Sequence, residues 1–106
     1  MIKTEIKIQL MLTDIKENIA KNGSKYLILK TKHTINTDKD LYIFVGCIMF
    51  KGYEDIIKNF KVGDEVIAMG EFRISNYKAK DNTYKNSYDI FLTSLINLKD
   101  YKEAKK

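Results

Sequence analysis

The spacing of apolar residues constrains this chain most, because it changes from every second position to every third or fourth and then back. A period of two places alternate side chains on opposite faces, which is the pattern of a β-strand. It occurs in residues 5–12, 26–33, 41–50, 65–77 and 88–98. Between the third and fourth of these segments the spacing is that of a short amphipathic helix, with Tyr53, Ile56, Ile57 and Phe60 on one stripe. The predicted order is therefore three strands, one helix and two strands.

The polar segments between these elements carry turn residues. Residues 13–25, 36–40 and 78–87 are predicted loops, the last one a lysine-rich hairpin loop. Gly63 suits the positive φ that follows many helices, and Gly70 marks a point where a strand can bend sharply. Core-facing apolar residues are expected in the first strand (Ile6, Ile8, Leu10 and Leu12) and in the last one (Ile90, Leu92, Ile96 and Leu98). The helix stripe is expected to pack against the same core.

This order predicts a mainly β fold in which the sheet closes on itself. Five short strands cannot protect both edges of an open sheet, so closure is favoured. A five-stranded antiparallel Greek-key barrel with one helix between strands 3 and 4 is the OB-fold. An SH3-like barrel would lack a helix at that position. The charged residues 99–106 are predicted to form a short, frayed C-terminal tail.

Charge is distributed unevenly along the chain. The net charge is +5, and Arg73 is the only arginine beside 18 lysines. Residues 51–71 hold three lysines against five acidic residues, whereas residues 72–88 hold four basic residues against Asp81 alone. Lysine enrichment in a low-GC genome accounts for much of the total but not for this segregation. The local excess of basic residues favours a polyanionic partner.

The third predicted strand has two chemically different faces. Alternation places mid-sized residues on the inner face: Ile43, Val45, Cys47 and Met49. The outer face carries three aromatic rings around a glycine: Tyr42, Phe44, Gly46, Ile48 and Phe50. Such a set is unusual on a surface in water. Either the helix or another subunit buries it, or the rings stack on the bases of a nucleic acid.

Stacking suits these residues because every base has a π-face, so aromatic rings bind single strands of any sequence. Lys30 and Lys32 share one face of the second strand and can neutralise phosphates beside the rings, and Arg73 can do the same or stack on a base. Further candidate contacts lie at the end of strand 4 and on the hairpin after it: Tyr77, Lys78, Lys80, Tyr84 and Lys85. The alternative for the hairpin lysines is a solvated face without a ligand.

Catalytic and metal-binding patterns are absent from the sequence. Cys47 is the only cysteine and His33 the only histidine, so neither a disulfide nor a cysteine cluster for zinc can form. Cys47 lies in an apolar run, which favours a small core residue. No phosphate-binding loop occurs, and no run approaches the ~18 apolar residues that span a membrane. We expect a non-enzymatic protein without cofactor or metal, located in the cytoplasm.

Several motifs together resemble bacterial and phage single-stranded DNA-binding proteins. They are residues 44–50 (Phe-Val-Gly-Cys-Ile-Met-Phe), the helix at 53–60, Lys-Val-Gly-Asp-Glu-Val at 61–66, and Gly-Glu-Phe-Arg at 70–73. The resemblance implies that Phe44, Phe50 and Tyr77 occupy the family's stacking positions, with Arg73 at its basic position. Phe44 and Tyr77 replace common tryptophans, and Lys51 replaces a glycine.

The family resemblance implies an OB-fold domain over residues 1–98 that binds single-stranded nucleic acid. This chain ends without the acidic tail of chromosomal members, so it is more similar to a compact phage or mobile-element type. The implied role is to coat single-stranded DNA in replication or recombination, as a homo-oligomer (a tetramer or dimer), with replication or recombination proteins as further partners. Two alternatives remain: an accessory module that contacts a helicase or primosome protein, and an RNA-binding OB module.

Overall fold

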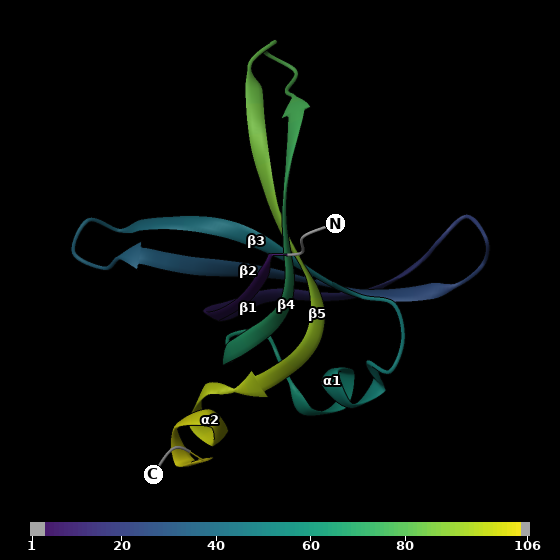
Figure 1. The fold of residues 1–106 in the computed structure, drawn as a ribbon, viewed down its shortest axis with the longest axis vertical. Coiled ribbons are helices and arrows are strands. Elements are labelled where there is room, and N and C mark those ends of the chain that lie inside the picture. The colour runs from purple at the N-terminus through teal and green to yellow at the C-terminus, as the bar shows by residue number, and fades with distance from the viewer. Residues whose placement is uncertain (1–3, 105–106) are drawn as a thin grey trace.

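The computed structural model describes residues 4–104, which form a closed β-barrel with two short helices (Figure 1). Its elements are β1 (Glu5–Ile19), β2 (Lys25–Asn36), β3 (Leu41–Met49), α1 (Glu54–Asn59), β4 (Glu65–Lys78), β5 (Tyr84–Asn97) and α2 (Leu98–Ala104). The strands follow the order β1-β2-β3-β5-β4 around the barrel. The predicted mainly β barrel with a helix between strands 3 and 4 is confirmed. Residues 1–3 of the predicted domain and 105–106 of the predicted tail lie outside the described residues.

The barrel closes between β3 and β5. This pairing is parallel and covers three residue pairs, from Gly46↔Asp89 to Ile48↔Phe91, whereas the other four pairings are antiparallel. A ring with an odd number of strands cannot alternate direction throughout, so at least one pair must be parallel. The predicted antiparallel pattern therefore holds for every neighbour except this closing pair.

Two hairpins are much longer than the sequence predicted. β1 and β2 stay paired as far as Ile19↔Lys25, and β4 and β5 as far as Lys78↔Tyr84. In Figure 1 these pairs and the β2–β3 pair project as three hairpin arms in different directions. The predicted loops at 13–25 and 78–87 are therefore too long. The strands stay paired through their backbones in the arms, but both faces of each arm are in water, so the apolar alternation that indicates a strand stops there. The connecting turns are residues 20–24 and 79–83.

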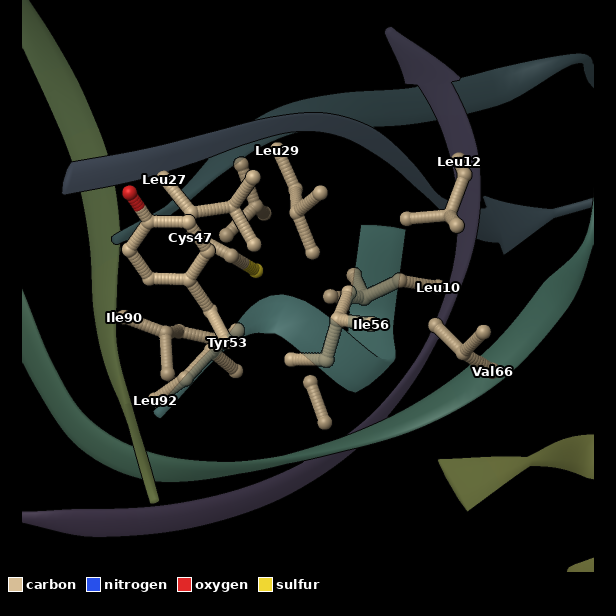
Figure 2. Packing of buried hydrophobic residues seen from close by; sticks show 12 residues of the cluster. Leu10, Leu12, Leu27, Leu29, Cys47, Tyr53, Ile56, Val66, Ile90 and Leu92 are labelled. Atoms are coloured by element: carbon tan, nitrogen blue, oxygen red, sulfur yellow. The ribbon is translucent and has the colours of Figure 1, made fainter. Parts of the chain in front are cut away.

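The core is apolar and comes from all five strands and the α1 segment (Figure 2). Its buried members are Leu10, Leu12, Leu27, Leu29, Val45, Cys47, Tyr53, Ile56, Val66, Ala68, Ile90 and Leu92. Ile6 and Ile8 pack against it, as predicted for the first strand. Thr31 is a buried polar residue, and its hydroxyl donates a hydrogen bond of 2.8 Å to the Val45 carbonyl oxygen. Among residues 4–104, no buried side-chain nitrogen or oxygen atom lacks a hydrogen-bond partner.

The α1 segment closes the core with two residues. Tyr53 and Ile56 point into the barrel in Figure 2, and Phe60 packs against its edge. Ile57 is 43% exposed, so its predicted place in the core is wrong; the six-residue helix buries only a narrow stripe. The Tyr53 hydroxyl donates a 2.5 Å hydrogen bond to Glu17 Oε2, which ties α1 to the β1–β2 arm and raises the pKa of Tyr53 to about 12. Gly63 has the predicted positive φ, at 96°.

A β-bulge changes the facing of β5. The register between β4 and β5 shifts between Met69 and Gly70, which leaves Thr93 without a paired residue on β4, although its hydroxyl donates a 3.2 Å hydrogen bond to the Met69 carbonyl oxygen. The irregularity predicted at Gly70 is confirmed, and a Cβ there would collide with the Phe91 carbonyl oxygen. Because one residue is added, Leu95 packs against the core in place of Ile96. The prediction of one continuous apolar face from Ile90 to Leu98 is wrong beyond the bulge.

The chain beyond β5 is ordered as a helix. Residues 98–104 form α2, which contacts β4 and β5, so the predicted frayed tail is wrong for these residues. The Lys7 ammonium lies 4.7 Å from the centre of the Tyr101 ring and links α2 to β1. Neither helix in residues 4–104 has the length and apolar character needed to cross a membrane.

Candidate nucleic-acid interface

The strands β2, β3, β5 and β4 present a continuous face away from the core, which we call the outer sheet face. The pairing registers align Lys32 with Phe44, Gly46 with Asp89, and Ile48 with Phe91 across this face. Its members also include Tyr26, Ile28, Lys30, Tyr42, Glu71 and Arg73, together with Phe50 just after β3. Sequence alternation predicted the β3 part correctly, because Val45 and Cys47 are buried and Phe44 and Phe50 are exposed.

Phe44 and Phe50 are 66% and 61% exposed. The α1 segment therefore does not cover the aromatic residues of β3, which removes one of the two alternatives for their burial. Contact of these rings with an apolar or aromatic partner is favourable, because it removes from water the apolar area that each ring leaves exposed.

One aromatic cluster forms around Phe50. Its ring stacks on Phe91 at 6.0 Å and 15° and lies 6.0 Å from Tyr26. The Arg73 guanidinium lies 4.2 Å from the Phe91 ring centre and forms a 3.3 Å ion pair with Glu71. Phe91 and Tyr26 were absent from the predicted site. Alternation could have identified Phe91 as a residue of the outer sheet face, since it lies between the buried residues Ile90 and Leu92.

A second cluster forms around Phe44. Its ring meets Tyr42 edge-on at 5.3 Å and 79°, and the Lys32 ammonium lies 4.1 Å from the Tyr42 ring centre. The structure thus brings together three of the predicted residues. The edge-on contact leaves at least one face of the Phe44 ring uncovered by Tyr42, and Lys32 adds a positive charge over the Tyr42 ring.

A groove of about 690 Å³ lies between β3 and the β4–β5 arm. It exists because β3 and β5 pair over only three residues and then diverge. The predicted residues Lys30, Phe44 and Tyr77 all line it. The groove therefore combines a cationic side chain with two partly exposed aromatic rings, which are the groups that single-stranded nucleic acids contact.

The hairpin residues of the predicted site do not share one surface. Tyr77 pairs with Lys85 and Lys78 with Tyr84, so the two pairs point to opposite faces of the β4–β5 arm. Lys80 lies in the turn. The same turn is fixed by Asp81, whose Oδ1 accepts hydrogen bonds from the Thr83 hydroxyl (2.6 Å) and amide (3.1 Å), which lower the pKa of Asp81.

An acidic residue that the sequence did not single out lies in the groove. Asp89 lines it beside Phe44, and its Oδ1 atom lies over Gly46, 2.6 Å from where a Cβ of residue 46 would be. Gly46 therefore gives space to the carboxyl group. In residues 4–104, no three His, Cys, Asp or Glu side chains gather in a way that could hold a metal ion.

No family model and no curated protein matches this chain by sequence. Solved structures are similar in shape. A small single-stranded DNA-binding protein from Streptomyces coelicolor superposes with a TM-score of 0.70 at 15% identity over 92% of this chain and 95% of its own. The mitochondrial single-stranded DNA-binding protein Rim1 from S. cerevisiae gives 0.70 at 10% over 92% and 97%. The protein PriB from Ralstonia solanacearum gives 0.61 at 7% over 92% and 98%. These similarities confirm the predicted OB-fold.

Proposed function

We propose that this protein binds single-stranded DNA without catalysis and accepts most sequences. The observation that carries the proposal is the exposure of Phe44 and Phe50 on the outer sheet face, within one surface that also holds Lys30, Lys32 and Arg73. Each ring that stacks on a base contributes roughly 1–3 kcal/mol, and the contact does not depend on base identity. In a duplex the base faces are already stacked, so single strands are preferred.

The fold supports this assignment. Two proteins of similar shape are named as single-stranded DNA-binding proteins, although their low identity carries no residue roles over to this chain. We further propose a role in coating DNA during replication or recombination, in a cytoplasm and as a homo-oligomer. A phage or mobile-element origin remains a prediction.

Fluorescence anisotropy with labelled oligo-dT and a matched duplex tests the proposal. We expect tight binding to the single strand and much weaker binding to the duplex, with a log–log salt slope of about −0.7 for each phosphate neutralised. Equal affinity for both, or no binding to oligo-dT at micromolar concentration in low salt, refutes the proposal. The second result favours the accessory module that contacts a helicase or primosome protein. Tighter binding to oligo-U than to oligo-dT favours the RNA-binding module.

The hairpin lysines allow a sharper version of this test. Lys78, Lys80 and Lys85 changed together to glutamine should make the salt slope less negative by up to about 2, if each neutralises one phosphate. A control with Lys58, Lys99 and Lys102 changed to glutamine alters the net charge equally on α1 and α2. If both variants change the slope alike, the hairpin lysines act only through net charge.

A further inference from the structure

Asp89 places a negative charge inside a groove that is otherwise suited to nucleic acid. Its carboxylate lies over Gly46 and lines the groove together with Phe44 and Lys30. A carboxylate repels a phosphate at close range, so a phosphate is disfavoured beside Asp89 and finds its cationic partner at Lys30 instead. The groups of a bound strand that suit Asp89 are the hydrogen-bond donors of its bases.

The carboxylate has little to satisfy it within the described chain. Arg73 is the residue paired with Asp89 across β4 and β5, but its guanidinium lies over Phe91 and pairs with Glu71. Ser87 Oγ donates to Asp89 Oδ2 over a long 3.5 Å, and no ion pair to Asp89 forms in residues 4–104. An ionised carboxylate has about four acceptor sites and no donor. Asp89 is thus free to accept hydrogen bonds from a ligand.

The four bases differ in what they can offer to such an acceptor. Guanine carries two adjacent donors on its Watson–Crick edge, the N1–H and an N–H of the 2-amino group, which match the two oxygens of a carboxylate. Thymine has one donor between two acceptors, and cytosine and adenine have one amino group beside a ring-nitrogen acceptor. In single strands this edge is open to protein side chains. A carboxylate therefore favours guanine over the other three bases.

The position of Asp89 relative to Phe44 supports this contact. Phe44 and Gly46 lie on the same face two residues apart, which corresponds to roughly 7 Å along the strand. Because Gly46 has no side chain, the Asp89 carboxylate lies over residue 46, where it can meet the edge of a base stacked on Phe44. The groove thus offers the Phe44 ring to the face of a base and the Asp89 carboxylate, over Gly46, to its edge.

We propose that Asp89 is a specificity-determining residue that selects guanine at the position next to Phe44. The proposal rests on the proposed function and deepens it: stacking binds any sequence, and Asp89 adds a preference at one position of the bound strand. A bidentate contact discriminates between bases, so we expect about tenfold tighter binding where guanine is available, which corresponds to about 1.4 kcal/mol.

Competition anisotropy with three oligonucleotides of about 16 nucleotides tests the proposal. One is oligo-dT, one carries 7-deazaguanine at every third position, and one carries inosine at the same positions. 7-Deazaguanine keeps both donors but cannot form quadruplexes, and inosine lacks the 2-amino donor. The wild-type protein should bind the 7-deazaguanine strand about tenfold more tightly than oligo-dT, and inosine should remove most of that gain.

The variant Asp89→Asn should lose the guanine preference and bind oligo-dT as tightly as the wild type or more tightly, because it removes a repulsive charge. Asp55→Asn makes the same charge change on the exposed side of α1 and should keep the preference. Thermal melting checks that both variants fold. Equal binding of all three strands by the wild type, or a preference that survives in Asp89→Asn, overturns the role of Asp89. Failure to bind oligo-dT at all refutes the proposed function instead.

Discussion

Replacing Phe44 by alanine separates the role of this ring in folding from its role in binding. Phe44 is 66% exposed, so only about a third of its surface is withdrawn from water in the free protein. Full burial of a phenylalanine stabilises by roughly 1.5–3 kcal/mol, and the edge-on contact with Tyr42 adds about 0.5–1.5 kcal/mol. The variant should therefore lose no more than about 2.5 kcal/mol of unfolding free energy.

The effect on binding should be larger. Loss of one stacked base costs roughly 1–3 kcal/mol, which corresponds to a 5- to 150-fold weaker affinity for oligo-dT. Anisotropy titration measures the dissociation constant, and urea denaturation measures the free energy of unfolding. Phe44→Tyr keeps a stacking ring and should stay close to the wild type.

Val62→Ala is a matched control, since Val62 is apolar and 58% exposed but lies in the turn between α1 and β4. It should change neither quantity much. A Phe44→Ala variant that binds oligo-dT within twofold of the wild type would refute the stacking role. If its free energy of unfolding then falls by well over about 2.5 kcal/mol, Phe44 acts as a packing residue.

Two further predictions concern buried groups. Burial raises the pKa of the Cys47 thiol to about 12, so a disulfide reagent at pH 8 should leave it unmodified in the folded protein and modify it fully in denaturant; rapid reaction of the folded protein would contradict its burial. The hydrogen bond to Glu17 raises the pKa of Tyr53 from 10 to about 12, so its contribution to stability is complete below pH 10 and is lost as the pH rises toward 12. The melting-temperature difference between the wild type and Tyr53→Phe should accordingly shrink over that range, and a constant difference would show that ionisation of Tyr53 does not affect stability.

The sequence predicted the barrel well where one side of a strand meets the core. The inner and outer residues of β3 follow from alternation alone. Successive side chains of a strand point to opposite faces, so Phe44 is exposed where Val45 and Cys47 are buried. The same reasoning failed beyond Thr93, since a bulge adds a residue without changing the composition of the strand. It also failed on the arms, where backbone pairing rather than side-chain burial sets the length of β1 and β5.

The sequence predicted which residue types form the candidate site better than it predicted which of those residues lie close together. Aromatic and basic residues identified Phe44, Phe50 and Arg73, but the proximity of Phe91 to Phe50 depends on the parallel pairing of β3 with β5. Asp89 carried no signal, because it is a single acidic residue near the start of the last predicted strand. Its position over Gly46 follows from the same pairing, which connects residues more than forty positions apart in the chain.

The parallel contact between β3 and β5 also determines at what point of its synthesis the barrel can close. Until β5 leaves the ribosome, β3 and β4 each present an unpaired edge, and β4 is held only through β1. Exposed strand edges of this kind favour pairing between chains. The nascent protein therefore passes through an interval in which four strands exist without closure, and the last strand ends that interval in one step. A chaperone that recognises extended segments would bind the chain during this interval. The rate at which β5 docks would determine how much of the newly made chain escapes aggregation.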